Sequence, residues 1–152
     1  MLIILAQVLF ALAIFLISIW VHELGHALAG LILTCGRVTV SVGGYCWEHP
    51  YYMGTRHHLT LRLIGWQMLA GYCEYEHPPR STVRQLLVTG AGPLASLFFA
   101  LMVLAAAISI GLVPWIACGA LPLFLTSILL TDGPKMWEIM FPPLYGFGRR
   151  RA

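Results

Sequence analysis

The sequence predicts an all-α polytopic membrane protein, with three core transmembrane helices and a small cytoplasmic insert that contains a β-hairpin. Of its 152 residues, 59% are hydrophobic and only 10% are charged, whereas soluble domains carry about 25% charged residues. Three apolar segments, at about residues 2–33, 86–110 and 115–130, are the candidate spans. The length allows one membrane-embedded domain, residues 1–152, with the insert at about residues 35–80.

The first apolar segment is predicted to be a retained membrane helix. A secretory signal peptide is the alternative, but such peptides have a positively charged start and an apolar core of about 7–15 residues. No lysine or arginine precedes Arg37, and the apolar run is longer than that core. The segment also exceeds the length of one span, so its last turns are expected to tilt or to project toward water.

The second and third segments are predicted to form an antiparallel helical hairpin, because only Gly111-Leu112-Val113-Pro114 separates them. The third segment is the shortest of the three. We expect it to end at Thr131-Asp132-Gly133-Pro134, although a continuation through Trp137 to Met140 is open.

The positive charges predict the orientation of the chain. All 9 lysine and arginine residues fall either between the first two spans or after the third. Three spans place these two regions on the same side, which the positive-inside rule assigns to the cytoplasm. We therefore expect a multi-pass protein of a prokaryotic cell membrane, with its N-terminus outside. The basic tail at 149–151 is interpreted as a topology signal or a contact with the lipid bilayer, not as a nucleic-acid site.

The insert is predicted to contain short β-strands. Residues 37–42 alternate apolar and polar side chains, and Gly43-Gly44 follows as a turn. Residues 58–64 alternate as well, with their leucines on one face. These two patterns indicate a short hairpin or a small sheet near the inner surface of the membrane.

The most informative motif is His22-Glu23-Leu24-Gly25-His26, an H-E-x-x-H sequence in the second half of the first segment. On a helix, residues four apart lie about 6 Å apart along the axis and about 40° apart around it, so both imidazoles can reach one metal ion. This spacing is typical of zinc metalloproteases, in which the glutamate takes a proton from water. A charged group costs roughly 2.5–3.5 kcal/mol at the bilayer centre, which favours a function over a chance match.

Asp132 is the candidate for a third metal ligand. Catalytic zinc sites have three protein ligands and one open position, and the two histidines leave one ligand to be found. Asp132 is the only aspartate in the chain, and it stands at the cytoplasmic end of the third span, on the same side as His22 and His26. Asp-Gly is also a common turn dipeptide, so a purely structural role is the alternative.

Three motifs together resemble the site-2 protease family of intramembrane zinc metalloproteases. Residues 21–27 match the family's first motif, residues 90–96 resemble the glycine-proline motif that opens its second core helix, and residues 131–133 resemble its Asp-Gly motif. The resemblance spans nearly the whole chain. It implies a zinc metalloendopeptidase that cleaves in or near the transmembrane segment of a membrane-bound protein or peptide. The implied zinc ligands are His22, His26 and Asp132, and the implied base is Glu23.

The chain departs from the family pattern at positions that the resemblance connects with substrate binding. Ser96 stands where the family often has asparagine, and residues 126–130 lack the family's Asn and Pro. An alternative is therefore a catalytically inactive relative that acts as a binding or regulatory membrane subunit. The chain has no room for the PDZ or CBS domain that members often add, so it resembles the minimal catalytic core.

The resemblance also suggests a role for the strand predicted over Val38 to Val42. A transmembrane substrate keeps its backbone groups in helical hydrogen bonds, so it must be extended before cleavage. We therefore expect this strand to be an exposed edge that pairs with the extended substrate.

Overall fold

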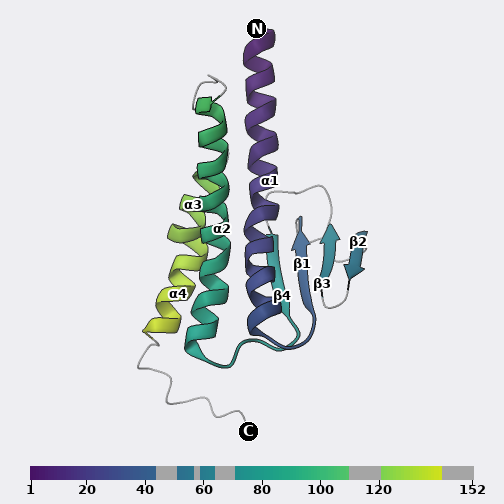
Figure 1. The fold of residues 1–152 in the computed structure, drawn as a ribbon, viewed down its shortest axis with the longest axis vertical. Coiled ribbons are helices and arrows are strands. Elements are labelled where there is room, and N and C mark those ends of the chain that lie inside the picture. The colour runs from purple at the N-terminus through teal and green to yellow at the C-terminus, as the bar shows by residue number, and fades with distance from the viewer. Residues whose placement is uncertain (44–50, 57–58, 64–70, 110–120, 142–152) are drawn as a thin grey trace.

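Two long antiparallel helices form the centre of the protein (Figure 1). Helix α1 (Leu2–Leu33) lies between helix α2 (Thr82–Ser109) on one side and a four-stranded sheet on the other. Shorter helical segments pack against α2. The computed structural model describes residues 1–43, 51–56, 59–63, 71–109 and 121–141.

Helices α1 and α2 are long and apolar enough to cross a membrane, over Ile4–Leu33 and Thr82–Ser109. Their outer faces carry large apolar side chains that are more than half exposed, such as Leu9 and Phe98, and such a surface suits lipid better than water. The first predicted helix is confirmed. The second begins earlier than the predicted residue 86, because Ser81 accepts a hydrogen bond from the backbone N–H of Arg84 and caps a polar first turn.

The third helical region continues past the point at which the sequence predicts its end. Helix α3 (Leu121–Thr126), a π-helical segment (Ser127–Thr131) and helix α4 (Asp132–Met140) follow one another without a break. An end at residue 130 is therefore wrong, and the continuation to Met140 is confirmed. Pro134 lies inside this continuous run, three residues after the end of the π-helical segment. The 111–114 connection and residues 115–120 of the third predicted span lie outside the described residues.

The π-helical segment depends on a glycine. A Cβ atom at residue 133 would overlap the backbone carbonyl oxygen of Ile128, so Gly133 allows a wider turn than an α-helix has. Asp132 lies where this turn passes into α4, and its side chain is buried. Single π-helical turns of this kind are frequent at functional sites.

The insert folds into a sheet with the strand order β2-β3-β1-β4. Its strands are β1 (Val38–Val42), β2 (Tyr51–Arg56), β3 (Leu59–Leu63) and β4 (Gly71–Tyr75). The two strands predicted from alternation are confirmed as β1 and β3, but they pair in parallel with each other. The antiparallel pair that is consecutive in the chain is formed by β2 and β3. Strands β2 and β4 escape prediction because their side chains do not alternate regularly.

Strand β1 is central, which contradicts the prediction that Val38 to Val42 is an exposed edge. It pairs with β3 on one side and with β4 on the other, and all its residues are buried. Its valines pack against Ile19 and Ala27 of α1. Alternation marks the face of a strand that is buried, but it does not tell whether a strand has one neighbour or two. The edges of the sheet are β2 and β4.

Close contact between α1 and α2 depends on Gly25. A Cβ atom at this position would overlap the backbone carbonyl of Ala91 and the side chain of Ala95, so α2 can approach only a residue without a side chain. The contact lies in the same turn as both motif histidines and brings α2 next to them. Pro93 lies inside α2, so the glycine-proline motif does not open this helix, as the resemblance implies that it should.

Candidate metal centre

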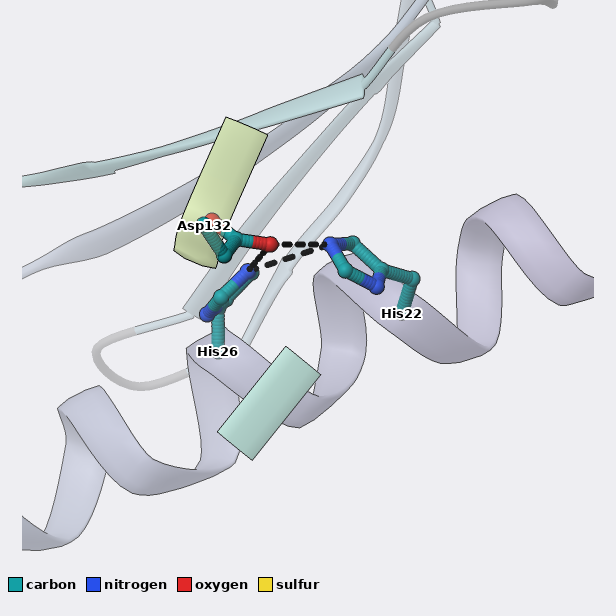
Figure 2. Close-up of side chains that lie close together, drawn as sticks. All are labelled: His22, His26 and Asp132. Carbon is teal, nitrogen blue, oxygen red and sulfur yellow. Dashed lines mark hydrogen bonds and ion pairs between the residues drawn. The ribbon is translucent and has the colours of Figure 1, made fainter. Parts of the chain in front are cut away.

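The two histidines of the H-E-x-x-H motif and Asp132 point toward one another (Figure 2). The Nε2 atoms of His22 and His26 are 3.2 Å apart. The Oδ2 atom of Asp132 lies 3.0 Å from the first nitrogen and 3.5 Å from the second. All three residues are buried. The side chains that the sequence predicts to share a metal ion are thus brought together from α1 and α4.

The distances among these three atoms fit a metal ion. Zinc binds nitrogen and carboxylate oxygen at about 2.0–2.2 Å, so two ligands at a tetrahedral angle are separated by about 3.3–3.5 Å. The measured separations are 3.0 to 3.5 Å. Within the described residues, the Oδ2 atom of Asp132 has no hydrogen-bond donor. A cation between the three atoms would satisfy it.

Helix α2 sets the orientation of both imidazole rings. The Nδ1 atom of His26 lies 2.8 Å from the backbone carbonyl of Val88, which can only accept, so this nitrogen carries the proton. In a neutral ring, Nε2 then has a free lone pair. The Nδ1 atom of His22 lies 2.9 Å from the hydroxyl of Ser96, which can accept in the same way. Such outer contacts fix the tautomer that a metal-binding histidine needs.

Ser96 therefore has a contact that the sequence did not reveal. The family resemblance connects this position with substrate backbone, whereas in the structure its buried hydroxyl bonds to His22 across 74 positions of sequence. No local pattern could have shown this contact, because it depends on how α1 and α2 pack.

Glu23 is buried beside the three converging side chains. Its Oε2 atom has no hydrogen-bond partner among the described residues. A Cβ atom at Gly71, the first residue of β4, would overlap the side chain of Glu23. The start of β4 thus covers this glutamate, and the position requires a glycine.

A second glycine makes room for His26. A Cβ atom at Gly92 of α2 would overlap its imidazole ring. By contrast, a Cβ atom at Gly90 would meet only the end of Met136, at an ordinary contact distance of 3.6 Å. The glycine-proline motif therefore holds one glycine that the site needs and one that it does not.

A cavity of about 240 Å³ opens beside these side chains. One wall is strand β4, where Tyr75 also donates a hydrogen bond of 3.3 Å to the backbone carbonyl of His26. Burial raises the pKa of Cys73 on this wall to about 11, so its thiol stays protonated at neutral pH. Burial likewise raises the pKa of Tyr75.

Lys135 lines the cavity as well, although none of the sequence motifs includes it. It stands three residues after Asp132 in the helical run, and residues at that spacing lie on one face of a helix. This spacing from Asp132 could have predicted that Lys135 lies near the site. The position of β4 in the cavity wall was not predictable in this way, because its contacts with α1 join residues far apart in sequence.

An H-E-x-x-H helix and a distant carboxylate, set among apolar helices long enough to cross a membrane, are features of the class of membrane-embedded metallopeptidases. The family model of Peptidase family M50 matches residues 10–147, which include all four site residues. The chain belongs to this family, the site-2 protease family, and is a membrane protein. No match was found among curated proteins or solved structures.

Proposed function

We propose that this protein is an intramembrane zinc metalloprotease that hydrolyses a peptide bond in or near the transmembrane segment of a membrane-bound substrate. The observation that supports it most strongly is the convergence of three ligand atoms, 3.0 to 3.5 Å apart, from two helices remote in sequence. In this proposal His22, His26 and Asp132 bind zinc. Glu23 is the general base.

Each of these residues has a defined part in hydrolysis. Zinc, when bound, supplies a Lewis acid that polarises the scissile carbonyl and makes water more acidic. Glu23 takes a proton from the attacking water through a carboxylate oxygen that no other group occupies among the described residues. The water oxygen bonds to the carbonyl carbon, the C–N bond breaks, and Glu23 returns the proton to the leaving amine. Burial of the site strengthens the electrostatic interactions of these side chains with the reacting groups.

The edge of β4 that lies away from β1 is the surface on which we propose that the substrate is held. Strand β4 pairs with β1 alone among the described strands. Its residues from Gly71 to Cys73 line the cavity beside Glu23. An extended peptide added to this edge would present its backbone to the site, as in strand addition.

Proline scanning along β4 tests the substrate edge. In an antiparallel strand, alternate N–H groups point toward the partner strand and away from it. At the outward positions proline should leave thermal stability and zinc content unchanged but weaken cleavage, whereas the same scan along β2, the distant edge, should not. Unchanged cleavage in all folded β4 variants would remove this part of the proposal.

We also propose a multi-pass topology with the N-terminus outside, which is supported by the antiparallel arrangement of α1 and α2 and by the positions of the basic residues. Cys35 is exposed just after α1 ends, so it reports the side on which that end lies. In a variant that keeps Cys35 as its single cysteine, a membrane-impermeant maleimide should label inverted membrane vesicles and not intact cells. The opposite labelling pattern would reverse the proposed orientation.

The substitution Glu23→Gln tests the enzymatic proposal. It keeps the shape of the side chain but removes the base, so cleavage of a membrane-embedded model substrate should fall by about 10²- to 10⁴-fold. Zinc content, measured by elemental analysis, should stay at the wild-type level. The matched control is Glu138→Gln, at an exposed position of α4, which should cleave normally.

Two outcomes would count against the enzyme. Cleavage by Glu23→Gln at the wild-type rate would show that Glu23 is not the base. A wild-type protein that binds zinc but cleaves no membrane-embedded substrate would favour the catalytically inactive relative, which acts as a binding or regulatory subunit.

A further inference from the structure

A second cavity is lined by residues at the end of α1 and before and within the start of α2. These two helix ends lie at the same end of the molecule (Figure 1). The volume of the second cavity is about 380 Å³, and none of its lining residues belongs to the cavity at the candidate metal centre. One wall is the turn that follows α1, from Leu33 to Cys35. The other is the segment from His77 to Arg80 that leads into α2, together with Arg84. The proposed proteolysis does not use this cavity.

The lining of this cavity is positively charged. Its lining residues include Arg80 and Arg84 and no aspartate or glutamate. Within the part of the chain that the structure describes, neither arginine forms an ion pair. The start of α2 adds the positive end of a helix dipole. An anion that enters the cavity would therefore meet two arginines, and no acidic residue belongs to the lining.

The walls of the cavity are held in place by hydrogen bonds. The side-chain amide of Gln85 donates to the backbone carbonyl of Pro79 at 2.9 Å. The hydroxyl of Ser81 accepts from the backbone N–H of Arg84 at 3.3 Å. These two contacts hold the segment that precedes α2 against the first turn of the helix. The two arginines therefore start from anchored backbone positions.

An exposed apolar stripe runs along α2 from Arg84. Leu87, Leu94, Phe98 and Leu101 follow it at helical spacings of three, four or seven residues, so they lie on one face. Each of these side chains is between 54% and 67% exposed. In a membrane this stripe faces lipid. Arg80 and Arg84 lie at the N-terminal end of the stripe, at the level of the headgroups.

We propose that this cavity binds the headgroup of an anionic phospholipid. Arg80 and Arg84 contact the phosphate, and one acyl chain lies along the stripe from Leu87 to Leu101. Guanidinium groups bind phosphate through paired hydrogen bonds, and basic pockets between membrane helices are suited to anionic headgroups. A free phosphate would contact the arginines alone. A phospholipid would contact both the arginines and the apolar stripe, so the stripe favours binding of the lipid over binding of free phosphate.

Lipid retention by the purified full-length protein in neutral detergent tests the proposal. Native mass spectrometry would count bound phosphatidylglycerol during a titration, beside parallel titrations with phosphatidylcholine of the same chains and with inorganic phosphate. The wild type should retain phosphatidylglycerol preferentially. Each arginine removed should weaken it about fivefold, and the double variant Arg80→Gln/Arg84→Gln about 25-fold. The matched control is Arg37→Gln, which removes an exposed charge outside the cavity.

Three results would overturn the proposal. One is unchanged phosphatidylglycerol retention in the double variant. Another is an equal loss in Arg37→Gln, which would show an effect of net charge alone. The third is inorganic phosphate that competes with the lipid at equal concentration, which would assign the site to a free anion. If the double variant does not fold, Arg84→Gln alone gives the same comparison.

Discussion

The two halves of α1 contain similar apolar residues but lie in different surroundings. Among its described side chains, every buried residue falls between Ile14 and Gly30, whereas the residues from Ile4 to Leu12 are mostly exposed. The buried positions recur at helical spacing and face α2 and the sheet. The first half is therefore suited to lipid, and the second is enclosed by protein. This enclosure, more than the hydropathy of the helix, creates a site that holds two histidines and a glutamate.

The largest expected effect on zinc binding and cleavage comes from a substitution in the second half of α1, compared with one in the first half. The substitution His26→Ala removes one of three proposed ligands, so bound zinc should fall from about one ion per chain to almost none, and cleavage should be lost with it. The control is Leu9→Ala, in the exposed half, which should keep both properties. Elemental analysis of the two purified variants makes the comparison. Full zinc content in His26→Ala would refute the assigned ligand set.

The next largest effect is expected from alanine substitutions at two glycines of α2, Gly92 and Gly90. Gly92→Ala should displace the His26 ring and reduce zinc affinity and cleavage by about 10- to 100-fold. Gly90→Ala has room for its methyl group and should stabilise the helix by up to about 1 kcal/mol. Zinc titration and thermal unfolding of both variants test this pair. Equal behaviour would mean that the close approach of α2 to His26 has no importance for the site.

The outer contact of His22 should matter less than its ligand atom. Ser96→Ala removes the hydroxyl that bonds to Nδ1, and zinc affinity should drop by about tenfold, toward the low end of the range for such contacts. Ser109→Ala, which removes an exposed hydroxyl bonded to the backbone of Ala105 at the end of the same helix, should leave it unchanged. If Ser96→Ala binds zinc as tightly as the wild type, Ser96 does not orient His22.

The last prediction concerns the chemical reactivity of the sheet that encloses the second half, and not zinc binding or cleavage. Because burial raises the pKa of Cys73 to about 11, its thiolate is a minor species at neutral pH. In a variant with Cys73 as its single cysteine, the rate of alkylation should rise about tenfold per pH unit between pH 7 and pH 10. A rate that levels off near pH 9 would mean that strand β4 leaves this thiol open to water.

The sequence predicts those parts of the site that depend on local spacing. His22, Glu23 and His26 lie on one helix, so their shared orientation follows from helix geometry. Asp132 was found because it is the only aspartate and because the charges suggest a common side. Contacts across the fold were not predictable. Ser96 meets His22 and Gly71 meets Glu23 only after α2 and β4 have packed against α1.

In the fold, as in the site, the features that depend on neighbouring residues were predictable, and those that depend on contacts between distant residues were not. Apolar runs locate α1 and α2, and alternation locates β1 and β3. The order of the strands depends on which strands pair, and neither pattern contains this information. The sequence therefore predicted β1 as an edge strand, although it is central. Neither pattern contains information on the π-helical segment, which depends on a backbone contact between Ile128 and Gly133.

That segment gives the last helical region a register with one residue more than a regular α-helix. An α-helix turns by about 100° per residue. If the five residues Ser127–Thr131 wound as a regular α-helix, Asp132 would be turned by about that angle, away from both imidazoles. The angular position of the third proposed ligand thus depends on the wide turn, and the wide turn depends on Gly133. A Gly133→Ala substitution, which keeps every site residue, should therefore separate the carboxylate from the histidines.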